Sequence, residues 1–198
     1  MKRRRPRQRR AQLTVDAILD SVTRLLKRGG VKAVTTNRIA EVAGVSIGSV
    51  YQYFPDKQAI FDALHDRHVG QMGQLVEDKL AEHAGSSLDD LVRALVEATV
   101  AAHAVDPELH ELLFSQVPHR AGEGHASPVA ERRLQSVLRR ALEARPARAP
   151  RELERTLFVL THMIEALGHG AVLDRPARLS LAAARDEAVR AVLAYLHA

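Results

Sequence analysis

The residues from Ala43 to Lys57, AGVSIGSVYQYFPDK, bring together side chains that could do chemistry. Serine and tyrosine hydroxyls, an amide and an ammonium group follow one another here, beside nearly half of the seven Tyr and Phe residues of the chain. Short polar and aromatic groups of this kind suit the floor of a DNA major groove and its phosphate walls. Thiolate catalysis, disulfides and Cys-ligated zinc are excluded because the sequence contains no cysteine.

Two short helices are predicted to present these side chains. The first follows Thr35 or Thr36, whose hydroxyl can cap it, and the second follows Ser46 in the same way. Gly44 lies between them and can adopt positive φ, and two short helices with glycine at the turn are typical of a helix-turn-helix. Apolar residues on both helices are spaced to hold them together. The outer face of the second helix should then carry Ser46, Ile47, Gly48, Ser49, Tyr51 and Gln52.

The charge of the chain is concentrated at its N-terminal end. Residues 1–57 carry 13 Lys and Arg against four Asp and Glu, whereas the remaining residues carry 16 against 20, which gives the net charge of +5. Seven of the basic residues lie in the first ten, MKRRRPRQRR. This distribution indicates a polyanionic partner, although a basic arm of this kind can also be a solvated, disordered tail.

The rest of the chain is predicted to be helical, so we expect an all-α protein with about nine helices and no strand. Ala, Leu, Arg and Glu dominate, and apolar residues recur at spacings of three and four. No apolar run approaches the roughly 18 residues of a membrane span, and we expect a cytoplasmic protein without a membrane partner. The predicted organisation is a basic arm over residues 1–12, a helix-turn-helix domain over 13–56 and a second helical domain over 57–198.

The segment TTNRIAEVAGVSIGSVYQYFPDKQAIFDAL resembles the DNA-binding segment of the TetR/AcrR family of transcriptional regulators. The family pattern is roughly T-x-x-x-I-A-x-x-A-G-V-S-x-G-x-[LV]-Y-x-[YH]-F-x-x-K-x-x-[LI], and the chain matches it from Thr35 to Ile60. The resemblance covers about residues 13 to 65. Beyond them, only length and helicity agree with the family.

The resemblance implies roles for single residues. Thr36 and Asn37 correspond to phosphate and base contacts, and the positions of Ile47 to Ser49 correspond to base readers. Tyr51 and Tyr53 would bind phosphates through their hydroxyls, Lys57 would add a charge at the start of the next helix, and Phe54 would pack inward. The basic arm could enter the adjacent minor groove. The predicted DNA-binding residues are Thr35, Thr36, Asn37, Ser46, Ile47, Gly48, Ser49, Tyr51, Gln52, Tyr53 and Lys57.

The resemblance also implies a homodimer and an effector site. Apolar residues of the last two helices form either the monomer core or the dimer interface, and the family pairs these helices with those of a second chain. The interface residues expected on that basis are Leu157, Leu160, Ile164, Leu167, Val192 and Leu196. The helices before them would enclose a small-molecule effector, although each candidate residue can instead be plain core. These candidates are Met72, Leu75, His103, His110, Phe114, Phe158, His162 and Met163.

The expected function is therefore that of a ligand-responsive repressor, which binds a palindromic operator as a homodimer and is released by an effector. A transcriptional activator of the same family and a nonspecific architectural DNA-binding protein remain alternatives. An enzyme is not expected, because the sequence has no E-x-x-H pair, no H-E-x-x-H motif, no nucleophile elbow and no phosphate loop. No cofactor and no metal are predicted.

Overall fold

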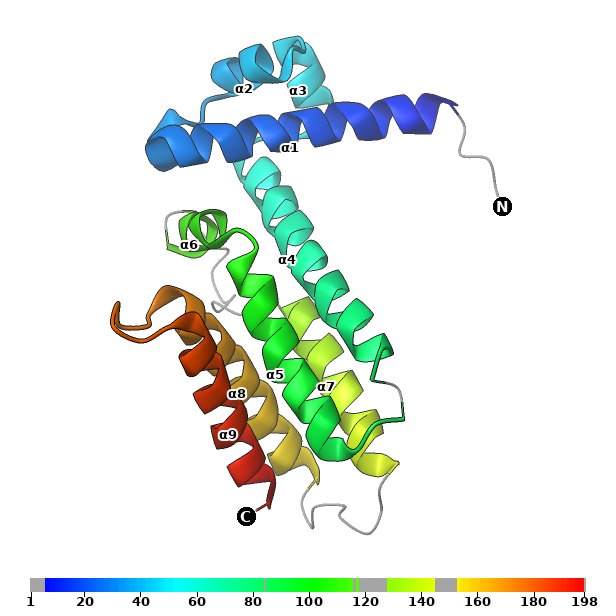
Figure 1. Ribbon diagram of the computed structural model, residues 1–198. Coiled ribbons are helices and arrows are strands. Elements are labelled where there is room, and N and C mark those ends of the chain that lie inside the picture. Colours follow the sequence, from blue (N-terminus) through cyan, green and yellow to red (C-terminus); the bar gives the residue numbers. More distant parts are fainter. Residues whose placement is uncertain (1–5, 84, 116, 118–127, 145–152, 198) are drawn as a thin grey trace. The chain divides into compact units, whose positions relative to one another are not determined.

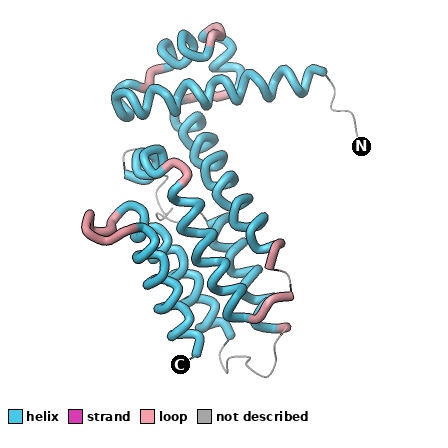
Figure 2. The backbone as a smooth tube through the Cα atoms, viewed as in Figure 1, coloured by secondary structure: helices cyan, strands magenta, loops and turns pink. Residues whose placement is uncertain are grey.

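The computed structural model describes the chain except for residues 1–5, 84, 116, 118–127, 145–152 and 198. Over the described residues the chain forms nine helices and no strand, which confirms the predicted all-α class, and Figure 2 shows only helices joined by loops. The helices are α1 (Pro6–Ala33), α2 (Thr36–Ala43), α3 (Ile47–Tyr53), α4 (Lys57–Ala81), α5 (Leu88–Ala104), α6 (Pro107–Ser115), α7 (Pro128–Glu143), α8 (Leu153–Leu173) and α9 (Leu181–His197).

The chain divides into two compact units. The first comprises Met1–His68 with Glu108–Arg120, and the second comprises Val69–Pro107 with Ala121–Ala198. The predicted boundary at residue 57 differs from this division, because the first part of α4 and nearly all of α6 belong to the N-terminal unit. A boundary drawn from motifs alone cannot anticipate that α6 returns to this unit.

The N-terminal unit is built on the long helix α1, against which α2 packs. Its core includes Ile18, Val22 and Leu25 from α1, and α6 completes that core with Leu109 and Leu113. The helix begins at Pro6, so residues 6–12 are helical, whereas we had expected the basic arm to extend to residue 12. Near its C-terminal end the backbone leaves helical geometry at Gly29 and Gly30.

The C-terminal unit is a bundle in which α5, α7, α8 and α9 lie side by side (Figure 1). Its core is formed by apolar residues of all four helices, among them Leu95, Leu138 and Val189. Helix α5 approaches α8 closely at Gly168, where an added Cβ would lie 2.6 Å from the Cγ2 atom of Thr99. The absence of a side chain at Gly168 is therefore a packing requirement of this bundle.

Helix α8 is long and apolar enough to cross a membrane by length and composition alone, which corrects the expectation that no apolar run approaches that length. The helix packs against α5, α7 and α9, and Leu160 and Ile164 are fully buried. Burial gives a physical reason for the apolar residues on the inner face of α8, although only 33% of its apolar window is buried.

Candidate nucleic-acid interface

Helices α2 and α3 are joined by a tight turn at Gly44. This residue has φ 68° and ψ 32°, the left-handed conformation that glycine adopts without steric cost. Its backbone N–H donates to the carbonyls of Ala40 and Glu41, and the N–H of Val45 also donates to Ala40 at 3.0 Å. The predicted turn between the two helices is thus confirmed, together with the reason for its glycine.

Both helices begin at the predicted caps. The Thr35 hydroxyl accepts from the N–H of Arg38 at 3.3 Å, and the Ser46 hydroxyl accepts from the N–H of Ser49 at 3.0 Å. The Ser46 and Ser49 hydroxyls also lie 2.9 Å apart. Capping satisfies N–H groups of the first helical turn that have no partner within the helix. Thr35 and Ser46 therefore stabilise the N-termini of α2 and α3 in the protein without a ligand.

Helix α3 has a buried face and an exposed face. Val50 is fully buried and Phe54 is 7% exposed, which confirms that Phe54 packs inward, and Tyr53 lies half-buried against the same core. On the other side, Ile47 is 43% exposed and Tyr51 is 52% exposed. A short helix that leaves large apolar and aromatic side chains in solvent presents a surface for a partner.

The predicted DNA-binding residues gather around this exposed face. The Tyr51 hydroxyl lies 3.5 Å from the Thr36 hydroxyl, so the start of α2 and the outer face of α3 meet there. Thr35, Asn37, Ser46, Gly48 and Gln52 are exposed, and Thr36 and Ser49 are half-buried.

Lys57, another predicted DNA-binding residue, is half-buried. Its ammonium group donates to the carbonyl of Val31 at 3.3 Å and lies 5.2 Å from the centre of the Phe61 ring. The side chain is therefore engaged within the unit, which the sequence did not predict, because Val31 lies 26 positions earlier in the chain.

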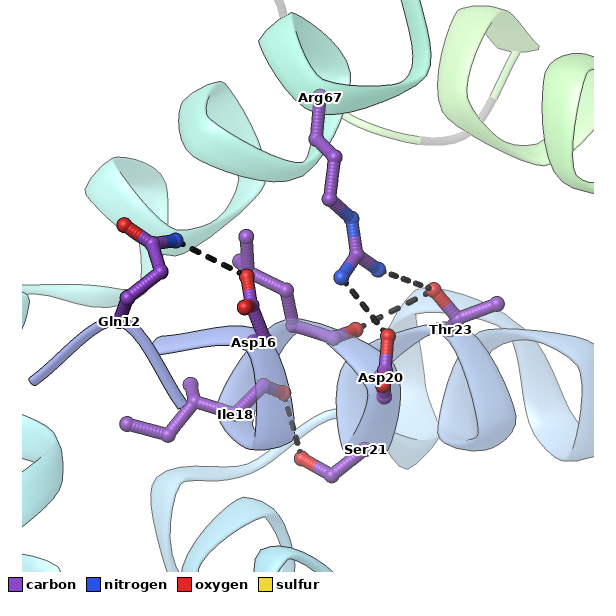
Figure 3. A network of polar contacts seen from close by, with 8 residues as sticks. Gln12, Asp16, Ile18, Asp20, Ser21, Thr23 and Arg67 are labelled. Atoms are coloured by element: carbon purple, nitrogen blue, oxygen red, sulfur yellow. Dashed lines mark hydrogen bonds and ion pairs between the residues drawn. The ribbon is translucent and has the colours of Figure 1, made fainter. Parts of the chain in front are cut away.

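Polar contacts join helix α1 to α4 within the same unit. Figure 3 shows Arg67 reaching from α4 to Asp20 and Thr23 on α1, with a distance of 2.7 Å between Arg67 Nη1 and Asp20 Oδ1. Helix α6 joins the same unit through His110, whose Nδ1 atom lies 3.0 Å from Nε2 of His68, and both imidazoles are buried. Polar contacts within the N-terminal unit thus join α1 to α4 and α4 to α6.

Comparison with known proteins agrees with this geometry. Residues 18–64 match the family described as bacterial regulatory proteins, tetR family. Residues 87–196, more than half of the chain, match the family described as Tetracyclin repressor-like, C-terminal domain. The chain belongs to the TetR family. It is a TetR-family transcriptional regulator with a helix-turn-helix region followed by the C-terminal domain of the family.

Individual relatives span most of this regulator. The HTH-type transcriptional regulator AcrR of Shigella flexneri is 27% identical over 168 residues, which cover 79% of this chain and 77% of that protein. A TetR-family transcriptional regulator from Streptomyces coelicolor has a TM-score of 0.62 at 24% identity and covers 93% of this chain and 98% of its own. FadR from Bacillus subtilis, solved in complex with stearoyl-CoA, has a TM-score of 0.65 at 15% identity over 91% and 98% of the two chains. The two structural likenesses show the fold.

The predicted effector residues of this TetR-family protein are distributed over both compact units. His110 and Phe114 belong to the N-terminal unit, where their rings stack with centroids 4.2 Å apart. Phe158 is 59% exposed on α8, and its ring lies 4.2 Å from the ring of His162, which is also exposed. The other four candidates, Met72, Leu75, His103 and Met163, lie in the C-terminal unit.

His103 is a buried polar candidate in the C-terminal unit. Its Nδ1 atom lies 2.8 Å from the carbonyl oxygen of Thr99, and its ring meets that of His169 edge-on with centroids 5.7 Å apart. Burial lowers the pKa of His103, against the opposing effect of the hydrogen bond to Thr99. A neutral imidazole is therefore favoured inside the C-terminal unit, with Nδ1–H donating to the carbonyl.

The predicted dimer residues are largely used within one chain. Leu157, Leu160, Ile164 and Val192 are buried in the core of the C-terminal unit, and Leu167 and Leu196 are half-buried against it. Helical spacing shows that these positions share a face, but it does not distinguish a partner helix of the same chain from one of a second chain. Within one chain, four of the six predicted interface residues thus belong to the core of the C-terminal unit.

Proposed function

We propose that this TetR-family regulator is a repressor, which binds a palindromic operator as a homodimer and leaves it when a small-molecule effector binds. The observation that carries the DNA-binding part is the exposed outer face of α3 with Ile47 and Tyr51, on a unit rich in Lys and Arg. A basic surface attracts the phosphate backbone, and an exposed helix of this size fits the major groove.

Gly48 supports the placement of α3 in a groove. Glycine inside a helix costs about 1 kcal/mol relative to alanine, yet a Cβ at this position would have only the Ser46 hydroxyl as its nearest neighbour, 3.8 Å away. Packing within the chain therefore does not require glycine there. Because Gly48 has no side chain, base pairs can approach the surface of the helix closely at this position.

The neighbouring side chains divide into base and backbone contacts. Ile47 offers an apolar surface that suits the methyl group of thymine. The Tyr51 and Thr36 hydroxyls, which lie 3.5 Å apart, suit the oxygens of one phosphate, because such contacts position a protein without reading sequence. We assign Asn37, Ser49 and Gln52 to the same surface.

The homodimer is proposed through the outer face of α8 and α9, because the inner stripe is already buried in the protomer. Phe158 and His162 stand on that outer face of α8, and Ala191 and Ala194 are exposed on α9. Large side chains opposite small ones suit a two-fold contact, in which the same surface serves both chains. A two-fold dimer matches a palindromic operator with half-sites about one helical turn apart.

The effector is proposed to bind in the C-terminal unit, which holds Met72, His103 and Met163. FadR from Bacillus subtilis, which has a similar fold, was solved with stearoyl-CoA, and this supports a ligand-binding role for such a fold. Release requires the effector to prefer the DNA-free state. Operator DNA must then weaken effector binding by the same factor.

Two substitutions on α3 test the DNA-binding surface by equilibrium binding to duplexes that differ at single base pairs. We expect Tyr51→Phe to weaken binding by a similar factor on every sequence, because a phosphate contact carries no sequence information. Ile47→Ala should instead alter the preference at one or two base pairs.

Val105→Ala is the matched control, since Val105 is an exposed apolar residue of the C-terminal unit, and it should change neither property. The reverse pattern for the two α3 variants would overturn the assignment of their roles. Competitor DNA of random sequence could also abolish binding at physiological salt. That result would favour a nonspecific architectural protein.

A further inference from the structure

Lys57 is held by two interactions inside the N-terminal unit. Its ammonium group donates to the Val31 carbonyl at 3.3 Å, and it lies 5.2 Å from the centre of the Phe61 ring, which is buried. The first is a charge-assisted hydrogen bond and the second a cation–π contact, and both favour keeping the ammonium where it is. Lys57 is itself half-buried at the first position of α4.

The carbonyl that Lys57 binds belongs to residues 31–35, which lie between the break in α1 at Gly29 and Gly30 and the start of α2, and which we call the α1–α2 turn. The turn follows Gly30, whose φ of 63° and ψ of −166° lie in a region that is essentially confined to glycine. The Val31 carbonyl also accepts from the N–H of Val34 at 3.2 Å. Since a carbonyl oxygen has two lone pairs, Lys57 and Val34 together satisfy it and close the turn.

The closed turn determines where α2 begins. Val34 is buried in the core of the unit, and the next residue, Thr35, caps α2 through the N–H of Arg38. Thr36 and Asn37 follow as the first residues of the proposed DNA-binding surface. A change in the backbone conformation of the turn would therefore displace the residues that α2 contributes to that surface.

We propose that Lys57 is a positioning residue for the DNA-binding surface, which acts by closing the α1–α2 turn and not by binding a phosphate. This inference rests on the proposed DNA-binding function. It differs from the role implied by the family resemblance, in which a lysine at the start of α4 adds a charge to the DNA contact. The geometry favours the turn, because the hydrogen bond to the Val31 carbonyl and the contact with the Phe61 ring both hold the ammonium group within the unit.

The test compares Lys57→Met, which keeps the apolar part of the side chain, with wild-type protein on a duplex selected by the wild type from a random pool. Positioning predicts that affinity falls about ten- to a hundredfold, the effect of one charge-assisted hydrogen bond, and by the same factor at every salt concentration. A phosphate contact predicts instead that the slope of log K against log salt becomes shallower by about 0.9. That shallower slope would overturn the proposal.

Amide hydrogen exchange of the full-length protein without DNA gives the second readout. Positioning predicts faster exchange at residues 34–38 in Lys57→Met, because the turn before α2 opens more often. Unchanged exchange there would contradict the proposal, since a phosphate contact leaves the free protein unaffected. Lys32→Met is the matched control: Lys32 is an exposed lysine of the same connector, so its loss removes the same charge and should leave exchange at residues 34–38 unchanged.

The outcomes separate this proposal from the proposed function. If wild-type protein selects no duplex, DNA binding fails, and the exchange measurement still decides the role of Lys57 in the turn. If Lys57→Met does not fold, Lys57→Gln repeats both measurements with a polar side chain. Failure of both variants to fold would support the structural role, because a residue that acts only on DNA is not needed for folding.

Discussion

Gly168 offers the sharpest test of the packing in the C-terminal unit, through its substitution by alanine. A Cβ at this position would lie 2.6 Å from Cγ2 of Thr99 and 3.4 Å from its Cβ, whereas carbon atoms in contact are normally about 3.5–4.0 Å apart. Thr99 is buried and β-branched, so its methyl group has few rotamers into which it can move. The α5 and α8 backbones must therefore separate.

The magnitude follows from two opposing effects. Overpacking of a core costs about 1–3 kcal/mol, while replacing a helical glycine by alanine gains about 1 kcal/mol. We expect Gly168→Ala to change the free energy of unfolding by between about zero and a 2 kcal/mol loss. Gly170→Ala is the matched control on the same helix, because its Cβ would meet only Asp174 Oδ2 at 3.9 Å, and it should gain about 1 kcal/mol.

Urea unfolding at a fixed protein concentration, followed by far-ultraviolet circular dichroism, measures both variants. The expected result is a difference of about 1–3 kcal/mol between Gly168→Ala and Gly170→Ala. Adding Thr99→Ser, which removes the methyl group in the way, should restore most of the stability of Gly168→Ala. Equal stability of the two single variants would refute the close approach of α5 and α8.

Three further predictions concern Thr161, His103 and the basic residues 2–10. Within the described part of the chain, the buried Thr161 hydroxyl has no hydrogen-bond partner. Thr161→Val should therefore raise the free energy of unfolding by about 1 kcal/mol. An unchanged or lower urea midpoint would contradict this prediction. Burial lowers the pKa of His103, so as pH falls below the ordinary histidine pKa the unfolded chain binds the proton first and the folded state loses stability. The urea midpoint of His103→Gln should therefore fall less between pH 7 and pH 5.5 than that of wild type. Equal falls of the two midpoints would contradict this prediction. Deletion of residues 2–10 removes seven Lys and Arg and should flatten the dependence of log K for DNA on log salt, whereas an unchanged slope would exclude the basic segment from the complex.

The parts of the fold that the sequence predicted correctly depend on residues close together in the chain. The caps Thr35 and Ser46 act on N–H groups three positions later, and Gly44 is required by its own backbone conformation. The inward packing of Phe54 followed from the same local pattern. Local rules therefore place α2 and α3, along with the turn between them.

The parts that the sequence missed depend on which distant segments meet. Spacing identified the stripe of Leu160 and Ile164 but not the helices that bury it, which belong to the same chain. The sequence did not indicate that α6 places His110 beside His68 in the N-terminal unit. Lys57 resembles a DNA contact by its position in the motif, while its actual partner lies 26 residues away.

The central claim, that the exposed face of α3 binds duplex DNA, is tested most directly by selecting double-stranded fragments from a random pool with the full-length protein. We predict that the pool converges on one palindromic sequence, which the protein retards in a gel at physiological salt in the presence of competitor DNA. A pool that does not converge, with no fragment retarded by wild-type protein, would contradict the claim.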